Sequence, residues 1–319
     1  MRAPDYWRHD GLAAKLLSPL AWGYRAVAAA RRGLARPYKG ECPVICVGNL
    51  VAGGAGKTPV ALAIGKRLIE RGHGVHFLSR GYGGSAAGPL RVEPGRHGAG
   101  DVGDEPLLLA ACAPTWVARN RPAGARAAVA AGAGVIVMDD GFQNPTLVQD
   151  LSLVVVDGDY GFGNGRVLPA GPLREPVAAG LARAGGAVVI GEAAACLAGF
   201  AKPILYGALQ PAPESASLAG RTVLAFAGIA RPEKFFATLQ AMDCKLVGAH
   251  GFPDHHRYSA DEVMTLVEAA NALHAVAVTT EKDHVRLPAE ARPMVEALAV
   301  EMTWSDRAAL DSLLHGIGL

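Results

Sequence analysis

A glycine-rich segment runs directly into a lysine and a threonine at Gly56-Lys57-Thr58. The apolar run 44–47 precedes this segment, and 60–64, which has the composition of a helix, follows it. A loop between a strand and a helix turns backbone N–H groups toward an anion, and the helix N-terminus adds partial positive charge. The lysine of such a loop reaches the β- and γ-phosphates of a nucleotide, and the threonine hydroxyl binds Mg²⁺. The predicted phosphate-binding residues are Gly53, Gly54, Ala55, Gly56, Lys57 and Thr58.

This loop departs from the usual G-x-x-x-x-G-K-[ST] pattern, because Val51 occupies the first glycine position. Its G-G-x-G-K-T form is typical of P-loop ATPases with a deviant Walker A motif. Those proteins usually carry a lysine where Ala52 stands. The alternative is a glycine-rich turn that binds nothing, and the strand before it and the helix after it favour the P-loop.

Two adjacent aspartates, Asp139 and Asp140, follow the apolar run 135–138. An acidic residue at the end of a strand, downstream of a P-loop, is typical of a Walker B site that holds Mg²⁺ directly or through water. A single aspartate in this position often only caps a turn. Two in succession after a P-loop favour the magnesium site.

Three further polar segments have both a chemical and a plain structural interpretation. Asp104 begins a helical segment, where it either caps the helix or orients and deprotonates a nucleophile. Arg174 and Glu175 lie between two prolines in a rigid loop, which suits a phosphate and its metal or a simple salt bridge. His255 and His256 point in different directions, so only one is expected to move a proton.

These residues require an alternation of strands and helices to position them. The expected strands are 44–48, 75–79, 135–138, 153–157 and 187–190, and the expected helices are 58–71, 104–112 and 121–132. This order predicts an α/β fold: a P-loop NTPase-like core with a mostly parallel sheet, plus a second smaller α/β lobe that starts near residue 221. The second lobe is expected to contain strands 222–227, 245–249 and 275–279 and helices 232–241, 259–273 and 307–315.

We predict three parts: a basic amphipathic membrane-association segment 1–40, a P-loop kinase core lobe 41–205 and a second α/β lobe 206–319 with the inter-lobe linker at its start. The length of 319 residues supports two lobes, and 50% hydrophobic residues suffice for a large core. Five cysteines form no disulfide framework, which suits a reducing compartment. Cys42 and Cys46 lack a second ligand pair, so buried thiols are favoured over zinc.

The N-terminal segment is strongly basic, although the net charge of the chain is only +2. Its cations alternate with tryptophans and leucines, and the run is too short and too charged to span a bilayer. It also lacks the pattern of a signal peptide. Two alternatives remain, a helix lying in the membrane interface and an amphipathic helix packed on its own domain. The cations are Arg2, Arg8, Lys15, Arg25, Arg31, Arg32, Arg36 and Lys39.

Seven motifs, taken together and in this order, resemble the tetraacyldisaccharide 4'-kinase family, the lipid A 4'-kinases of Gram-negative bacteria. They span most of the chain, up to about residue 286. The departure from the family pattern is Asn144, where members often carry a histidine. The motifs are VGNLVAGGAGKTP, LSRGYGG, GDEP, MDDGFQN, GNGRVLPAGPLREP, FPDHHRY and TTEKD.

The resemblance implies specific roles for individual residues. Lys57 and Thr58 match the P-loop lysine and the Mg²⁺ ligand, and Asp104 with His255 matches an acid–histidine dyad that activates a sugar hydroxyl. The implied acidic residues around Mg²⁺ are Asp139, Asp140 and Glu175. Arg174 matches an arginine on the phosphate side. The candidate substrate contacts are Asn49, Arg80 and Tyr82.

The implied activity is transfer of the γ-phosphate of ATP to the 4'-hydroxyl of a tetraacylated disaccharide 1-phosphate. The implied location is the cytoplasmic face of the bacterial inner membrane, with the lipid substrate and the membrane surface as partners. No obligate protein partner is inferred, and nucleic acid is not expected, since no stacking platform is evident.

Two other classes remain as alternatives. One is a regulatory ATPase or metallochaperone-type NTPase, which shares the G-G-x-G-K-T loop. The other is a nucleotide-binding membrane adaptor without catalysis, which leaves the DHH and REP motifs without a purpose.

Overall fold

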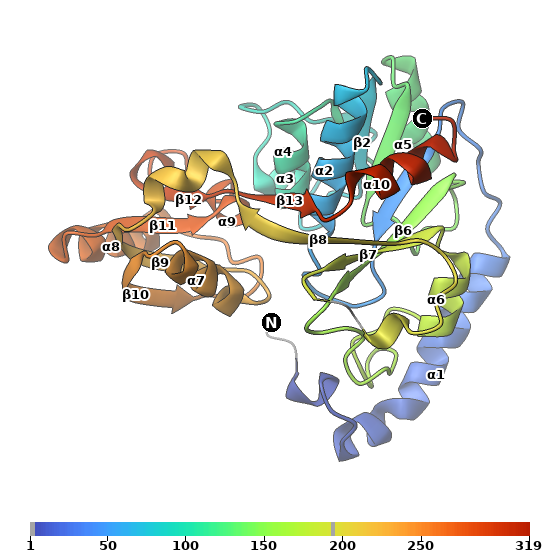
Figure 1. Ribbon diagram of the computed structural model, residues 1–319, viewed down its shortest axis with the longest axis horizontal. Coiled ribbons are helices and arrows are strands. Elements are labelled where there is room, and N and C mark those ends of the chain that lie inside the picture. Colours follow the sequence, from blue (N-terminus) through green and yellow to red (C-terminus); the bar gives the residue numbers. More distant parts are fainter. Residues whose placement is uncertain (1–3, 193–194) are drawn as a thin grey trace.

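The computed structural model describes residues 4–192 and 195–319, which form two α/β lobes (Figure 1). Residues 1–3, with Arg2 of the basic segment, and residues 193–194 lie outside the described parts. Four short 3₁₀ helices complete the elements given below: η1 (Asp5–Trp7), η2 (Ala195–Leu197), η3 (Pro213–Leu218) and η4 (Arg292–Met294).

The larger lobe is built on a nine-stranded sheet. Its strands are β1 (Val44–Gly48), β2 (Val75–Ser79), β3 (Leu90–Arg91), β4 (Thr115–Val117), β5 (Val135–Asp139), β6 (Leu151–Asp157), β7 (Gly186–Ile190), β8 (Ile204–Pro211) and β13 (Val300–Trp304). They lie in the order β13-β8-β7-β6-β1-β5-β2-β4-β3. The strands from β8 to β4 run parallel, and the two edge strands pair antiparallel with their neighbours. The predicted α/β core with a mostly parallel sheet is confirmed.

Helices cover both faces of this sheet. They are α1 (Leu12–Gly33), α2 (Lys57–Glu70), α3 (Ala99–Val102), α4 (Asp104–Ala110), α5 (Arg121–Ala130), α6 (Val177–Arg183) and α10 (Arg307–His315). Alternate residues of β1 face two separate hydrophobic clusters, one shared with α5 and α6 and the other shared with α2 and α10. Because both faces are covered, the central strands are continuous apolar runs, which is why the sequence identified them.

The smaller lobe repeats the same architecture around a four-stranded parallel sheet. Its elements are β9 (Thr222–Ala227), α7 (Pro232–Ala241), β10 (Lys245–Gly251), α8 (Ala260–Ala272), β11 (Val276–Thr280), α9 (Glu281–His284) and β12 (Glu296–Leu298). The strands lie in the order β10-β9-β11-β12, with a hydrophobic cluster on each face. The predicted second lobe is therefore present, and its elements begin and end close to the predicted residues.

The lobes are joined by β8 and β13, which run side by side between them (Figure 1). These strands pair antiparallel from Val300 opposite Pro211 to Trp304 opposite Gly207. After β13 the chain returns to the larger lobe, where Leu310 and Leu314 of α10 are buried in its core. Residues 206–211, expected as part of the inter-lobe linker, lie in β8 of the nine-stranded sheet. The expectation that 300–319 belongs to the second lobe was wrong, because β13 and α10 join the larger lobe. Half-exposed β8 lacks a continuous apolar run, so the sequence suggested a linker there.

Helix α1 extends along the outside of the larger lobe (Figure 1). Ala14 and Ala21 face the protein and are buried, whereas Leu12, Leu16 and Leu20 are at least 63% exposed. No helix in the described parts of the chain is both long and apolar enough to cross a bilayer.

Candidate active site

The P-loop joins β1 to α2 at the C-terminal edge of the parallel sheet. Gly53 and Gly56 have φ values of 118° and 78°, which glycine adopts without steric cost. A Cβ on Gly56 would also lie 2.4 Å from Cδ1 of Ile190. The positive φ is the main reason for glycine at Gly56, because the tip of the Ile190 side chain could move aside. Lys57 follows as the first residue of α2.

Thr58 and Asp139 meet beside the P-loop, as the Walker pattern predicts. The Thr58 hydroxyl donates a hydrogen bond of 2.9 Å to Oδ2 of Asp139. The other carboxylate oxygen, Oδ1, is buried and has no hydrogen-bond partner among the described residues. Burial, together with the charge of Asp140, raises the pKa of Asp139 to about 7. A buried and half-satisfied carboxylate beside a threonine hydroxyl is the donor set that a magnesium site needs.

Asp140 connects the P-loop lysine to Arg174. Its Oδ1 lies 3.7 Å from Nζ of Lys57, and Arg174 donates to both carboxylate oxygens, at 2.7 and 3.2 Å. Burial by itself would raise the pKa of Asp140, but Lys57 and Arg174 outweigh burial and lower it to about 2. Asp140 also adopts a left-handed φ of 52°, which is uncommon outside glycine and concentrates at functional sites.

Glu175 has a different environment from the one expected of a metal ligand. Its side chain is only 2% exposed, and Arg32 of α1 and Arg183 of α6 donate to it at 3.0 and 2.6 Å. Arg183 donates a second hydrogen bond of 3.0 Å, and Gln143 adds one of 3.2 Å. These donors lower the pKa of Glu175 although burial acts to raise it. The Glu175 oxygens thus contact Arg32, Arg183 and Gln143, which anchors α1 and α6 to this loop, while the expected contact with Mg²⁺ stays a prediction.

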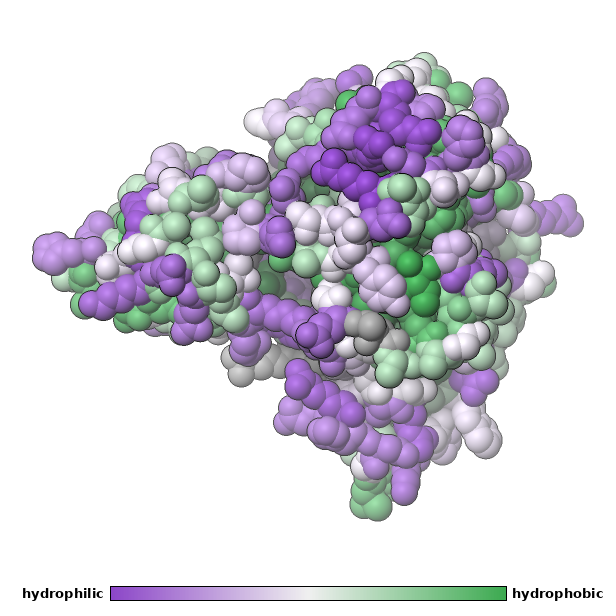
Figure 2. All heavy atoms as spheres, viewed as in Figure 1, coloured by the Kyte–Doolittle hydropathy of each residue, from purple (hydrophilic) through white to green (hydrophobic). Residues whose placement is uncertain are grey.

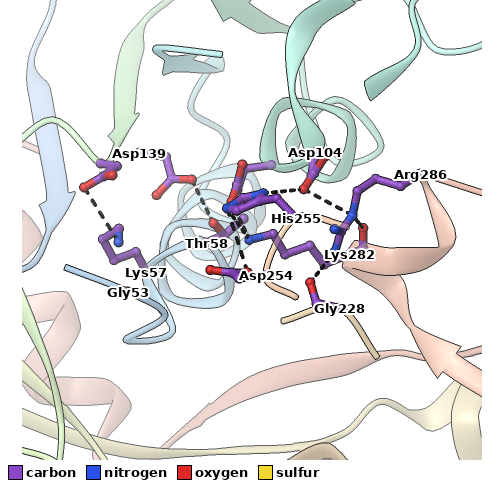
Figure 3. Close-up of polar contacts among 12 residues, drawn as sticks. Gly53, Lys57, Thr58, Asp104, Asp139, Gly228, Asp254, His255, Lys282 and Arg286 are labelled. Atoms are coloured by element: carbon purple, nitrogen blue, oxygen red, sulfur yellow. Dashed lines mark hydrogen bonds and ion pairs between the residues drawn. The ribbon is translucent and has the colours of Figure 1, made fainter. Parts of the chain in front are cut away.

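The predicted acid–histidine pair is in contact across the two lobes. Nδ1 of His255 lies 2.9 Å from Oδ2 of Asp104, although the two residues are 151 positions apart (Figure 3). Asp104 begins α4, and its preceding residue Gly103 has a φ of 88°. A Cβ on Gly103 would lie 2.4 Å from the carbonyl oxygen of Tyr82, so glycine lets the LSRGYGG and GDEP motifs pack together.

Arg286 and Lys282 support this pair and were not identified as site residues from the sequence. Arg286 is 4% exposed, and its guanidinium lies 3.3 Å from Asp104 and 2.7 Å from Asp283. Nζ of Lys282 lies 3.4 Å from Nε2 of His255 and 2.9 Å from Glu105. Burial disfavours the charged form of Lys282, but Glu105 outweighs burial and raises its pKa. The sequence signal for Lys282 was its place in the TTEKD motif, and Arg286 follows Asp283 of that motif by three residues.

The two adjacent histidines differ clearly in their surroundings. His255 points toward Asp104 and has a left-handed φ of 59°. His256 turns the other way, stacks on Phe252 at 4.8 Å and lies 3.2 Å from Glu262. The geometry thus joins His255 to the acidic residue, while its catalytic role stays a prediction.

The three candidate substrate contacts lie in different environments. Tyr82 is 67% exposed, and its ring centroid lies 5.5 Å from that of His255, so it faces the site. Arg80 is exposed. Asn49 is fully buried, and its Nδ2 lies 3.5 Å from the carbonyl oxygen of Gly53. A buried side chain offers no surface to a substrate, so Asn49 lies where it supports the P-loop.

The assembled site extends from Lys57 at one end to Arg286 at the other, with His255 between them (Figure 3). The P-loop belongs to the larger lobe and the histidine to the smaller one. Hydrophilic side chains gather at the narrow waist where the lobes meet (Figure 2). A nucleotide-binding loop, a half-satisfied carboxylate and an acid–histidine pair where the two lobes meet suit the transfer of a phosphoryl group to a hydroxyl.

Comparisons with known proteins agree with this arrangement. The family model of LpxK, tetraacyldisaccharide-1-P 4'-kinase, matches residues 13–317. A tetraacyldisaccharide 4'-kinase of Rhodospirillum centenum is 55% identical, with 98% of this chain and 96% of the relative covered. One of Rhodospirillum rubrum is 53% identical, with 98% and 97% covered.

A solved structure shares the whole fold. The crystal structure of LpxK from Aquifex aeolicus in complex with ATP superposes with a TM-score of 0.76 at 26% sequence identity. The match covers 96% of this chain and 99% of that one. Both lobes are therefore part of the shared architecture.

Proposed function

The chain belongs to the tetraacyldisaccharide-1-P 4'-kinase family, and we propose that it transfers the γ-phosphoryl group of ATP to the 4'-hydroxyl of a tetraacylated disaccharide 1-phosphate in lipid A biosynthesis. The observation that carries the proposal is the contact between Asp104 and His255 across the lobes, beside a P-loop. The regulatory ATPase alternative is not favoured, because such a protein has no use for this pair.

The pair is arranged to accept the proton of the attacking hydroxyl. If Nδ1–H of His255 donates to Asp104, Nε2 carries the lone pair that would accept the proton, and Nζ of Lys282 lies beside it at 3.4 Å. The ion pair with Arg286 holds the Asp104 carboxylate in place. Asp104 thereby fixes the histidine tautomer, and His255 acts as the general base.

The P-loop side neutralises charge on the transferred group. The transition state of phosphoryl transfer is loose, so catalysis depends on positioning and on electrostatic stabilisation. Lys57 supplies a cation at the start of α2, and Asp140 and Arg174 fix the position of its ammonium group. Removing the lysine charge should therefore slow the chemical step.

We also infer a requirement for Mg²⁺ from the donors that are present. Thr58 and the unpartnered Oδ1 of Asp139 would hold the ion, directly or through water. No group of three or more His, Cys, Asp or Glu side chains in the described parts of the chain forms a metal cage. That fits Mg²⁺, which in nucleotide sites uses one or two carboxylates together with substrate phosphates. When bound, the ion neutralises phosphate charge.

A phosphotransfer assay tests the activity. Wild-type protein, Asp104→Asn and the control Glu93→Gln are incubated with labelled ATP, Mg²⁺ and the disaccharide 1-phosphate in mixed micelles. Glu93 pairs with Arg96 on the surface and should leave the rate unchanged. Asp104→Asn should lower kcat by about 10²- to 10⁴-fold, the usual range for general acid–base catalysis. Product without label at the 4'-position, or full activity of Asp104→Asn, would contradict the proposal.

We further propose that α1 docks this enzyme on a membrane surface that holds its lipid substrate. At about 100° per residue, Leu12, Leu16, Leu20 and Val27 fall within about 80° of the helix circumference. All four are at least 63% exposed, and the opposite side is the one that packs on the protein. Hydrophobic surface is visible at the projecting end of α1 (Figure 2).

The other side chains of the N-terminal segment differ in their surroundings. Trp22 is 71% exposed, whereas the indole Nε1 of Trp7 is buried. Arg31 is exposed beside the apolar stripe and placed to meet anionic headgroups. Arg25 is exposed on the opposite side of the helix, and Arg32 binds Glu175. Docking would leave the acyl chains in the bilayer, since extracting them costs about 0.8 kcal/mol per CH₂. The cytoplasmic face of the inner membrane is the proposed site, because ATP is the phosphate donor.

Vesicle sedimentation tests this proposal. The triple variant Leu16→Ser, Leu20→Ser, Val27→Ser loses about 1.5 kcal/mol or more of burial per residue and should no longer co-sediment with anionic vesicles. A matched control, Leu273→Ser with Met294→Ser, removes exposed apolar residues of the smaller lobe and should bind normally. The apparent KM for lipid should rise in the triple variant while ATP affinity is kept. Unchanged co-sedimentation of the triple variant would contradict membrane docking through α1.

A further inference from the structure

The turn that follows β9 in the smaller lobe, residues 228–231, contacts the P-loop of the larger lobe. Arg231 Nη2 donates a hydrogen bond of 2.9 Å to the carbonyl oxygen of Gly54. The same nitrogen lies 2.5 Å from Oδ2 of Asp157, at the end of β6. The guanidinium also lies over the ring of Tyr160, at 5.4 Å from its centroid. Arg231 therefore touches a loop and a strand end of the lobe opposite its own.

The other end of this turn holds the histidine of the site. The carbonyl oxygen of Gly228 accepts hydrogen bonds from the backbone N–H of His255 and from Arg286, both at 3.0 Å. The backbone N–H of Gly228 donates to Asp283 at 2.9 Å. The four residues of the turn thus span from the backbone of His255 to the P-loop, and Gly228 lies beside Arg286 in the close-up (Figure 3).

A hydrogen bond to the Gly54 carbonyl has a direct effect on phosphate binding. In a planar trans peptide the C=O and the following N–H point in opposite directions. Holding the Gly54 carbonyl toward Arg231 therefore fixes the direction of the Ala55 N–H, one of the amides of the phosphate cradle. The P-loop has glycines at three of its four positions before Lys57, so it has little side-chain packing of its own to fix that direction.

The position of Arg231 is itself fixed by charge. Asp157 has a side chain only 9% exposed, and Lys234 of α7 also donates to it, at 2.9 Å. Burial acts to raise the pKa of Asp157, but Lys234 and Arg231 outweigh it and lower that pKa. Lys234 forms a further ion pair with Asp159 at 2.7 Å, and its recorded polar contacts do not include the P-loop.

We propose that Arg231 is a positioning residue for ATP, by which the smaller lobe orients the P-loop of the larger lobe and sets its spacing from His255. The inference rests on the proposed kinase function. It predicts that nucleotide affinity depends on a residue outside the P-loop lobe. It also predicts that this dependence of nucleotide affinity comes from the hydrogen bond to Gly54 and not from the charges around Asp157.

Equilibrium binding of ATP, measured without lipid, separates the effect of the hydrogen bond to Gly54 from the effect of the surrounding charge. Arg231→Ala removes the bond to Gly54, and Lys234→Ala is the matched control, since it weakens only the pairing with Asp157 and Asp159. We expect Arg231→Ala to raise the Kd for ATP about tenfold, the worth of one charge-assisted hydrogen bond. Lys234→Ala should change it less than about threefold, as for a partly exposed ion pair. The KM for lipid should be unchanged in both variants.

Arg231→Lys keeps the charge opposite Asp157 but loses the planar fork, so its Kd should lie between those of wild type and Arg231→Ala. Thermal unfolding checks that each variant is folded. If Arg231→Ala fails to fold, Arg231→Lys still tests the inference. Equal Kd values for Arg231→Ala and Lys234→Ala, or a wild-type Kd for Arg231→Lys and Arg231→Ala, would overturn the inference. Wild-type protein that binds no ATP would instead overturn the proposed kinase function.

Discussion

Replacing the two adjacent histidines one at a time should separate catalysis from stability. His255→Ala removes the ring nitrogen that faces Asp104 at 2.9 Å, and with it the proposed general base. His256→Ala removes a ring that packs inside the smaller lobe. The same substitution at neighbouring positions makes each variant the control for the other.

The structure sets the size of both effects. Loss of a general base lowers kcat by about 10²- to 10⁴-fold, and ATP affinity should stay near that of wild type, since the base acts on the hydroxyl. His256 stacks on Phe252 and meets the ring of Tyr258 edge-on, both at 4.8 Å. At about 0.5–1.5 kcal/mol per aromatic pair, His256→Ala should lower the free energy of unfolding by about 1–3 kcal/mol. Its kcat should fall only a few-fold.

The assay combines phosphotransfer kinetics in mixed micelles with denaturant unfolding of the same preparations. His255 has a left-handed φ of 59°, which disfavours alanine, so His255→Asn is measured as well. Asparagine tolerates this conformation, and the variant isolates the loss of the base from backbone strain. The reasoning is refuted if His256→Ala loses more kcat than both His255 variants, because the histidine joined to Asp104 would then not be the base.

Two other substitutions test the roles of Lys57 in the P-loop and of Glu175. Lys57→Ala should lower kcat by about 10²- to 10³-fold in the phosphotransfer assay, because it removes a positioned cation, and a near-wild-type rate would exclude the P-loop assignment. Glu175→Gln should lower the free energy of unfolding by about 1–3 kcal/mol, since Arg32 and Arg183 lose a buried partner but are partly exposed themselves. Its Mg²⁺ dependence, measured by metal titration of the rate, should match wild type; a higher Mg²⁺ requirement at unchanged stability would restore the metal role.

The sequence alone predicted those strands and motifs that depend on residues close together in the chain. The central strands are buried on both faces and are therefore continuous apolar runs, and the P-loop must have glycine where φ is positive. Thr58 and Asp139 follow from the same logic, because parallel strands bring their C-terminal ends to one edge of the sheet. These features depend on neighbouring residues, and a single sequence records them.

Contacts between distant segments were decided only by the tertiary structure. The sequence could not show that Glu175 pairs with Arg32, which is 143 positions away, or that the larger lobe buries Asn49. The return of β13 and α10 to the larger lobe likewise depends on contacts between distant segments.

Residues 228–231 illustrate the difference most clearly. Their composition is that of an ordinary turn, and only the packing of the two lobes places Arg231 on Gly54 and Gly228 on His255. Hydrogen bonds and ion pairs between lobes are set by three-dimensional distance, which the spacing of residues along one chain does not record.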